Sequence, residues 1–183
     1  MFTFCPNCAS RNIAFLERKV FRCPDCGFEF YHNTAAACGC IIESDGRILI
    51  LVRDAEPQKG KLDLPGGFIE PNEGILEGLY REIQEETGWT PFIPPGKTLT
   101  DIFTFFTSFS NVYLYKNIPY NTCDLYFRLN VPGLREQDLI PQQGEIAAIH
   151  FIKPQDIDLD AIAFASTRQA VERYLQKYSI QGS

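Results

Sequence analysis

From residue 35 onward, hydrophobic residues fall into short runs that are separated by turn-forming residues. The runs AAACGCII and SDGRILILVR predict two strands joined at Ser44-Asp45-Gly46, because this tripeptide favours a tight turn. The runs LTDIFTFF, TCDLYFRLNV and EIAAIHFI are rich in aromatic and β-branched residues and predict further strands.

Two other segments repeat hydrophobic residues at helical spacing. One spans residues 73 to 86, where Asn72 is the expected cap, and the other spans residues 166 to 177. In the first segment four apolar residues would share one buried face, namely Ile75, Leu76, Leu79 and Ile83. Strands interleaved with few helices predict an α/β fold, a mixed sheet flanked by helices.

Composition restricts the class of protein. The 183 residues are 45% hydrophobic, which is enough to bury a core, and the net charge of −6 argues against binding to nucleic acid or anionic membranes by bulk charge alone. No run approaches the roughly 20 apolar residues that span a bilayer. Seven cysteines are an odd number for a disulfide framework and favour a reducing compartment, so we expect a cytoplasmic protein.

Four cysteines form two C-x-x-C pairs near the N-terminus. Cys5 and Cys8 enclose Pro-Asn, Cys23 and Cys26 enclose Pro-Asp, and each pair is spaced to bend around one cation. Four thiolates would complete a closed, structural Zn²⁺ site, and the pattern resembles a zinc ribbon over residues 1–34, followed by a second domain at 35–183. A redox dithiol is the alternative. The other three cysteines are expected to be buried small side chains: Cys38, Cys40 and Cys123.

Three glutamates crowd the end of the first predicted helix. At 3.6 residues per turn Glu82, Glu85 and Glu86 fall within an arc of roughly 100° at the border of its apolar face. Neighbouring carboxylates repel one another unless a cation lies among them, and Mg²⁺ prefers such oxygen ligands. A solvated acidic helix face is the alternative. Arg81 can pair with Glu77 or Glu85 one turn away, or with Glu73 if the chain bends back.

The spacing around these glutamates is specific. Gly67 is followed after five residues by Glu73, and after seven more by Arg81-Glu82-Ile83-Gln84-Glu85-Glu86-Thr87-Gly88-Trp89. This resembles the Nudix box, G-x5-E-x7-R-E-U-x-E-E-x-G-U, in which U is a bulky apolar residue, at every specified position. The resemblance extends over roughly residues 35 to 178. It implies a Nudix α/β/α sandwich with a mixed sheet, preceded here by the small zinc ribbon.

The resemblance also implies an activity, the hydrolysis of a diphosphate linkage in a nucleoside diphosphate derivative with Mg²⁺ or Mn²⁺. In this sequence Glu82, Glu85 and Glu86 would bind the metal ions, and Arg81 would orient these carboxylates. The metal would neutralise the diphosphate and lower the pKa of an attacking water. Glu145 is expected as an additional ligand or general base.

Further residues are expected to support the metal ligands or to contact the substrate. Glu136 is the second candidate for the later carboxylate, Gly67 would open the loop, and Glu73 would brace it. Contacts with substrate are assigned to Gly66, Gly67 and Arg53, because two adjacent glycines allow close approach. Tyrosines in the segment FTSFSNVYLYKNIPYNTCDLYF, such as Tyr113, would either stack on a base or close the core.

Substrate and partners stay open at this stage. NADH-type pyrophosphatases also join a zinc ribbon to a Nudix domain, which favours a dinucleotide, ADP-ribose or nucleotide sugar, but TPFIPPGKTL stands where that group carries S-Q-P-W-P-F-P-x-S. The alternative function is a nucleotide-sensing binding protein whose ribbon contacts protein or nucleic acid. A small nucleotide is the favoured partner, nucleic acid is not favoured, no membrane is expected, and a homodimer is compatible with the sequence.

Overall fold

The computed structural model describes residues 2–17, 19–116 and 118–178. By its internal contacts the chain separates into two compact units, Met1–Thr34 and Ala35–Ser183. Within the described ranges, none of the helices is long and apolar enough to cross a membrane.

The N-terminal unit is a small antiparallel sheet of three short strands, β1 (Ala14–Leu16), β2 (Val20–Arg22) and β3 (Glu29–Tyr31). Both C-x-x-C pairs lie in tight loops closed by backbone hydrogen bonds, from Ala9 N to Cys5 O and from Gly27 N to Cys23 O. Its buried hydrophobic residues are few, with Phe21, Cys5 and Cys23 the most enclosed. A core of this size needs an additional constraint such as a metal ion to be stable.

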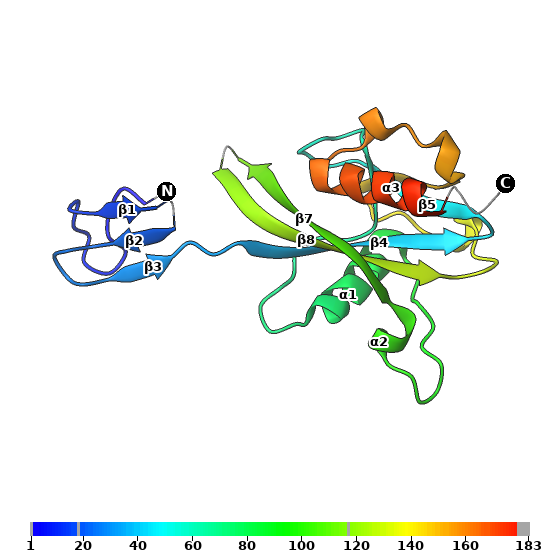
Figure 1. The fold of residues 1–183 in the computed structure, drawn as a ribbon, viewed down its shortest axis with the longest axis horizontal. Helices are drawn as coiled ribbons and strands as arrows, with labels where there is room; N and C mark the ends of the chain where they lie inside the picture. Colours follow the sequence, from blue (N-terminus) through cyan, green and yellow to red (C-terminus); the bar gives the residue numbers. More distant parts are fainter. Residues whose placement is uncertain (1, 18, 117, 179–183) are drawn as a thin grey trace. The chain divides into compact units, whose positions relative to one another are not determined.

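The second unit is built on a six-stranded mixed sheet (Figure 1). Its strand order is β6-β5-β4-β8-β7, with β9 paired to β5. The β4–β8 pair is parallel and the other pairs are antiparallel, so the predicted mixed sheet is confirmed. The strands are β4 (Ala35–Ser44), β5 (Arg47–Arg53), β6 (Leu62–Asp63), β7 (Thr104–Tyr115), β8 (Ile118–Asn130) and β9 (Ile146–Ile152).

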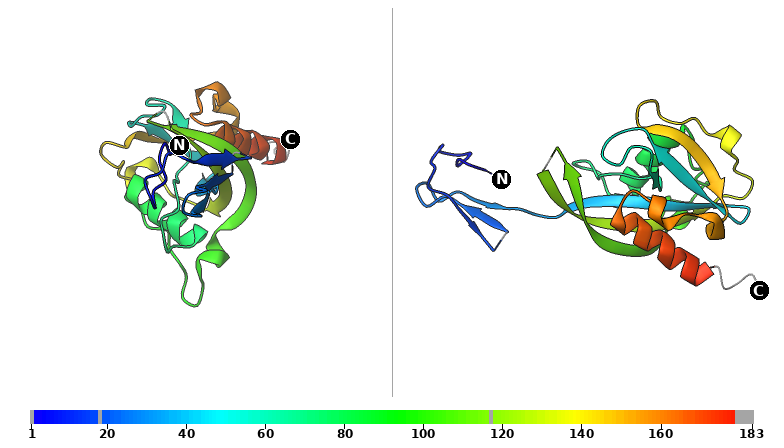
Figure 2. Two further views of the ribbon diagram at one scale, coloured as in Figure 1. Left: turned by 90° about the vertical axis from the view of Figure 1, so that its left-hand side faces the viewer. Right: turned by 90° about the horizontal axis from the view of Figure 1, so that it is seen from above.

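Helices cover both faces of this sheet (Figures 1 and 2). Alternate residues of β4 and β5 therefore enter different cores: Ile42 and Leu49 pack with helix α1, whereas Ile41 and Ile48 pack with helix α3. Burial on both faces explains why these strands are almost continuously hydrophobic. The helices are α1 (Ile75–Thr87), α2 (Leu99–Ile102) and α3 (Ala165–Tyr178), and three 3-10 turns are η1 (Glu136–Asp138), η2 (Pro154–Asp156) and η3 (Leu159–Ala161).

Three local expectations were wrong. Residues 99–102 form the short helix α2 instead of a strand, because the Asp101 carboxylate accepts a hydrogen bond from Thr98 N and caps a helical turn. Helix α1 is capped at Gly74 rather than Asn72, since the Glu77 carboxylate takes the Gly74 N–H. The Cys123 side chain is exposed, whereas Cys38 and Cys40 are buried as expected.

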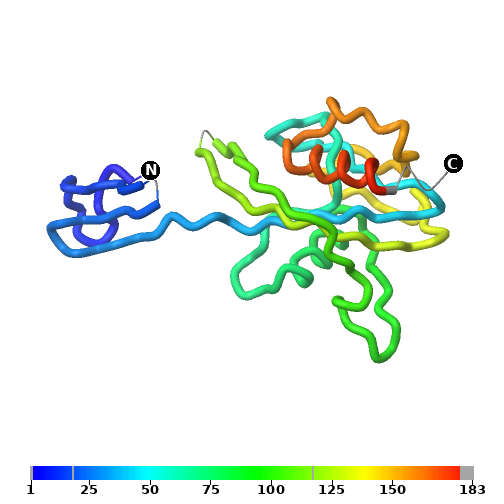
Figure 3. The backbone as a smooth tube through the Cα atoms, viewed as in Figure 1, coloured from blue at the N-terminus to red at the C-terminus, as the bar shows by residue number. Residues whose placement is uncertain are grey.

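The aromatic segment between α2 and the later strands forms the long hairpin β7–β8, whose course is visible in Figure 3. Its register pairs Asn111 with Thr122 and Phe109 with Asp124, and β8 is held against β4 by the pairing of Ala37 with Asp124. Because side chains alternate along a strand, Thr122, Asp124 and Tyr126 face the same side of the sheet, and all three are buried. This polar strip lies on one wall of the candidate site.

The other edge of β4 holds the loop that precedes α1. Cys38 N donates to Gly67 O and Cys40 N donates to Pro65 O, so the segment 65–67 runs beside β4 like an extra strand. Gly66 has φ +143, and a Cβ at this position would lie 2.1 Å from Cys38 O. Only glycine allows the loop to approach β4 so closely.

Candidate active site

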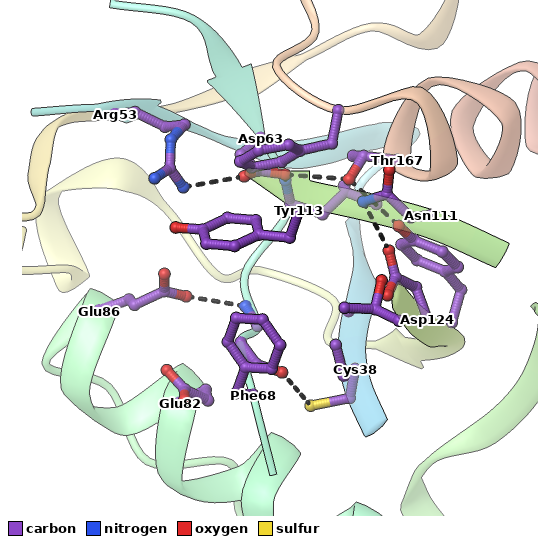
Figure 4. Close-up of a pocket in the computed structure, with 18 of the residues that line it drawn as sticks. Cys38, Arg53, Asp63, Phe68, Glu82, Glu86, Asn111, Tyr113, Asp124 and Thr167 are labelled. Atoms are coloured by element: carbon purple, nitrogen blue, oxygen red, sulfur yellow. Dashed lines mark hydrogen bonds and ion pairs between the residues drawn. The ribbon is translucent and has the colours of Figure 1, made fainter. Parts of the chain in front are cut away.

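One cavity of ≈ 340 Å³ is lined by α1, which we call the acidic helix, by the loop around Gly66 and Gly67, which we call the glycine loop, and by the polar strip of β8. Figure 4 shows Glu82 and Glu86 on one side of this pocket and Asp124, Asn111 and Thr167 on the other. The volume lies within the range of about 300–1,000 Å³ that is usual for small-molecule sites.

Glu86 is the most enclosed carboxylate of α1, with 7% of its surface exposed. Its Oε2 accepts a hydrogen bond of 2.8 Å from Gly66 N, so the glycine loop holds this side chain against the pocket. Burial raises the pKa of Glu86 well above its usual value, although the Gly66 bond opposes this, and the charges of Glu82 and Asp63 raise it further. A cation bound nearby would stabilise the ionised form of this buried carboxylate.

Glu82 lies beside Glu86 and is held from the other side by Arg81. Burial raises the pKa of Glu82, while the ion pair between Arg81 Nη1 and Glu82 Oε1, 2.9 Å long, lowers it. Gly67 leaves room for this carboxylate, because a Cβ at Gly67 would lie 2.6 Å from Glu82 Oε1. A larger residue at position 67 would therefore displace the Glu82 carboxylate from its present place.

Arg81 connects the helix to the loop. Its Nε and Nη2 donate to the two carboxylate oxygens of Glu73 at 3.1 and 2.8 Å, and Nη2 also donates to Phe68 O. Its Nη1 contacts Glu85 Oε2 at 3.1 Å as well as Glu82. Of the partners named by the sequence, Glu73 and Glu85 are used, whereas Glu77 caps the helix.

The remaining predicted carboxylates take different positions. Glu145 lines the pocket from the loop before β9 and raises the pKa of both Glu82 and Glu86 through its charge. Glu85 is exposed, pairs with Arg81, and is outside the described pocket lining. Glu136 lies in a separate hollow with Arg47, where its Oε1 accepts from Phe151 N.

The glycines and Arg53 that were assigned to substrate contact all line the pocket. Gly66 N is already bonded to Glu86, so it positions a carboxylate in this structure. Arg53 pairs with Asp63 at 3.2 Å and lies over the Phe164 ring at 5.0 Å. Burial raises the pKa of Asp63 to about 6, and Arg53 limits the rise.

Several residues that line the pocket were not predicted from the sequence. Asp63, Asn111, Asp124 and Phe164 come from four different segments, and no local motif marks them. The alternation of polar residues at Thr122, Asp124 and Tyr126 within a hydrophobic strand is the one signal that was available. Tyr113, a candidate for base stacking, lines the pocket.

The four cysteines of the N-terminal unit come together in a separate cluster. Their Sγ atoms all lie within 4.8 Å of one another, and the distances are 3.6 Å for Cys5 to Cys26 and 3.7 Å for Cys8 to Cys23. Four sulfurs about 2.3 Å from a tetrahedral zinc would be about 3.8 Å apart. The Asn7 amide lowers the pKa of Cys26, whereas the neighbouring sulfurs raise that of Cys8, so the four thiols influence one another's ionisation. The cluster fits a zinc ion.

This chain is similar to known proteins in both sequence and fold. A 77-residue match is 42% identical to the ADP-ribose pyrophosphatase of Methanocaldococcus jannaschii, covering 42% of this chain and 44% of that protein. An 85-residue match is 32% identical to the NAD-capped RNA hydrolase NudC of Chromobacterium violaceum, covering 46% of this chain and 32% of that protein. These matches span less than half of either relative.

A solved structure extends the likeness to the whole chain. The NUDIX hydrolase from Nitrosomonas europaea superposes with a TM-score of 0.67 at 25% sequence identity, covering 100% of this chain and 94% of that one. The family model of the NUDIX domain matches residues 32–174. The predicted fold class is confirmed, and the chain belongs to the NUDIX domain family.

Proposed function

We propose that this protein hydrolyses the diphosphate linkage of a small nucleoside diphosphate derivative with the help of Mg²⁺ or Mn²⁺. The observation that carries the proposal is the buried Glu86 carboxylate, which shares a pocket with Glu82 and Glu145. Arg81, which holds Glu82, is already occupied by Glu73 and Glu85. Such a carboxylate group is suited to a hard divalent cation and a phosphate.

Glu82, Glu86 and the exposed Glu85 are the proposed metal ligands. When bound, the ion would supply positive charge to the diphosphate and lower the pKa of a water. Gly66 N–H fixes Glu86, and Arg81 fixes Glu82 and Glu85, so the protein holds the acceptor oxygens in place before substrate arrives. Glu145 is the proposed base that receives the proton of the attacking water.

The relatives support the substrate class. One is named for ADP-ribose and another for NAD-capped RNA, and both substrates contain a diphosphate joined to adenosine. We therefore place adenosine diphosphate derivatives first among the substrates of this chain. In the N-terminal unit Cys5, Cys8, Cys23 and Cys26 are the proposed ligands of a structural zinc ion.

A substrate panel tests the proposal. Purified protein is incubated with ADP-ribose, NADH, nucleotide sugars, nucleoside triphosphates and NAD-capped RNA, with Mg²⁺, with Mn²⁺ or with a chelator, and products are separated by chromatography. We expect metal-dependent release of a nucleoside monophosphate from at least one small substrate. Tight nucleotide binding without any cleavage would contradict hydrolysis and favour the nucleotide-sensing alternative.

A further inference from the structure

The polar strip of β8 contains two buried oxygen atoms that have no partner. Thr122 Oγ1 and Asp124 Oδ1 lack a hydrogen bond to any described residue. The two residues are 2% and 7% exposed, and both line the pocket. Because nearly all buried polar atoms in proteins are hydrogen-bonded, a pair of unpaired atoms on a pocket wall indicates that a ligand completes them.

The Asp124 carboxylate is held so that one buried oxygen has no hydrogen-bond partner. Its Oδ2 accepts hydrogen bonds from Ser166 Oγ at 2.5 Å and from Asn111 Nδ2 at 3.2 Å. Ser166 lies in the first turn of α3 and Asn111 belongs to the neighbouring strand β7, so two separate elements fix the carboxylate. Oδ1 is left as an acceptor that neither element uses.

Aromatic rings lie between this acceptor and the acidic helix. The Tyr113 ring contacts Phe68 with centroids 5.3 Å apart and Phe164 at 5.4 Å, and all three residues line the pocket. In Figure 4 Tyr113 and Phe68 lie between the Glu82 and Glu86 side and the Asp124 side. Aromatic faces favour a flat heterocycle over a sugar, because planar rings stack on each other.

We propose that Asp124, assisted by Thr122, is a specificity-determining residue that accepts a hydrogen bond from the exocyclic amine of the substrate nucleobase. This inference rests on the proposed function, because the diphosphate at Glu82 and Glu86 directs the base toward the aromatic residues and β8. An ionised carboxylate only accepts hydrogen bonds. An amino group matches it, whereas the oxo group of an otherwise similar base places two acceptors against each other.

Matched pairs of nucleotides test the inference. ADP-ribose is compared with inosine diphosphate ribose, and CTP with UTP, because each pair exchanges an amino group for an oxo group. We expect the wild-type chain to prefer the amino member by at least about 10-fold in kcat/KM. The ratio is measured within one preparation, so any loss of folded protein cancels.

The decisive variant is Asp124→Asn. Ser166 and Asn111 both donate toward the position of Oδ2, so the new amide oxygen would face them and the amide nitrogen would face the pocket. We expect this variant to lose the amino preference or to reverse it toward the oxo base. Thr122→Val removes Thr122 Oγ1 and leaves Asp124 unchanged. We expect this variant to prefer the amino base less strongly than the wild type does.

A binding measurement separates this inference from the hydrolysis proposal. Calorimetric titration with AMP and with IMP, without metal, should show tighter binding of AMP to the wild type and a smaller difference for Asp124→Asn. Hydrolysis of ADP-ribose and inosine diphosphate ribose with equal kcat/KM, or a ratio that Asp124→Asn leaves unchanged, would overturn the inference while the proposed activity stands. Absence of hydrolysis with the AMP preference intact would overturn only the activity.

Discussion

Asp63 illustrates how a single pocket residue is tuned by its surroundings. Its carboxylate pairs with Arg53 Nη1 through Oδ2, and its Oδ1 accepts from Leu64 N and Thr167 Oγ1. Burial nevertheless outweighs these favourable partners and raises the pKa of Asp63 from 3.8 to about 6. The native protein therefore binds this proton more tightly than the unfolded chain does.

This difference predicts a pH dependence of stability. Because the pKa is higher in the folded state, the contribution of Asp63 is fully present below the unfolded pKa of 3.8 and is lost as pH rises through the folded pKa of about 6. Relative to Asp63→Asn, which does not ionise, the wild type should lose up to about 3 kcal/mol of unfolding free energy over this interval. Urea unfolding of both proteins at several pH values, without added metal, measures the difference. A constant or rising difference would contradict the assignment.

At the level of elements, α1 and the glycine loop act as one unit. The Arg81 guanidinium bonds to Glu73 in the loop with two nitrogens and to Glu82 and Glu85 on the helix with a third. The planar guanidinium can donate to these carboxylates at the same time because its N–H groups point in fixed directions. A lysine ammonium cannot reproduce this arrangement, although it keeps the charge.

Arg81→Lys should therefore impair the site with the fold intact. We expect a loss of about 10- to 100-fold in metal affinity or turnover, the range seen when supports of metal ligands are altered. The measurement is the Mg²⁺ dependence of hydrolysis together with Mn²⁺ binding. Arg168→Lys is the matched control, because Arg168 on α3 forms an exposed ion pair with Asp160 in η3. Equal behaviour of the two variants would count against the bracing role of Arg81.

The sequence predicted α1 well and the β8 wall poorly, for a physical reason. Helix α1 is encoded locally, since apolar spacing and the carboxylate motif lie within one stretch, and the observed Ile75–Thr87 is close to the predicted 73 to 86. The wall depends on the parallel pairing of β4 with β8, a contact between distant segments. Asp124 and Asn111 come to line the same pocket only when the strands of the sheet have paired.

The error at α2 has the opposite origin. Residues 99–102 have strand-like composition, but the hydrogen bond from Thr98 N to Asp101 starts a helical turn before β7 begins at Thr104. A local side-chain cap thus outweighed the β-propensity of a short segment. Tertiary contacts and caps, rather than composition, decide such boundaries.

At the scale of the whole molecule, the two units have different sources of stability. The sheet unit has two hydrophobic cores, one on each face, whereas the N-terminal unit has little beyond its cysteine cluster. For small units of this kind, the free energy of metal binding is a large part of the free energy of folding.

Cys23→Ser should therefore lower the zinc content and unfold residues 2–34 while the sheet unit stays folded. Elemental analysis gives the metal content, and amide hydrogen exchange reports each unit separately. Cys123→Ser is the matched control, because Cys123 is exposed on β8 and outside the cluster. Unchanged zinc content and unchanged protection in Cys23→Ser would contradict a structural zinc site.

The central claim is that the buried carboxylates of α1 serve metal-dependent hydrolysis of a diphosphate. The most direct measurement is kcat/KM for ADP-ribose as a function of Mg²⁺ in the wild type, in Glu86→Gln and in Glu77→Gln, which alters only the helix cap. We predict Mg²⁺-dependent turnover in the wild type, a loss of about 100-fold or more in Glu86→Gln, and little change in Glu77→Gln. Turnover that needs no divalent ion, or that persists in Glu86→Gln at saturating Mg²⁺, would contradict the claim.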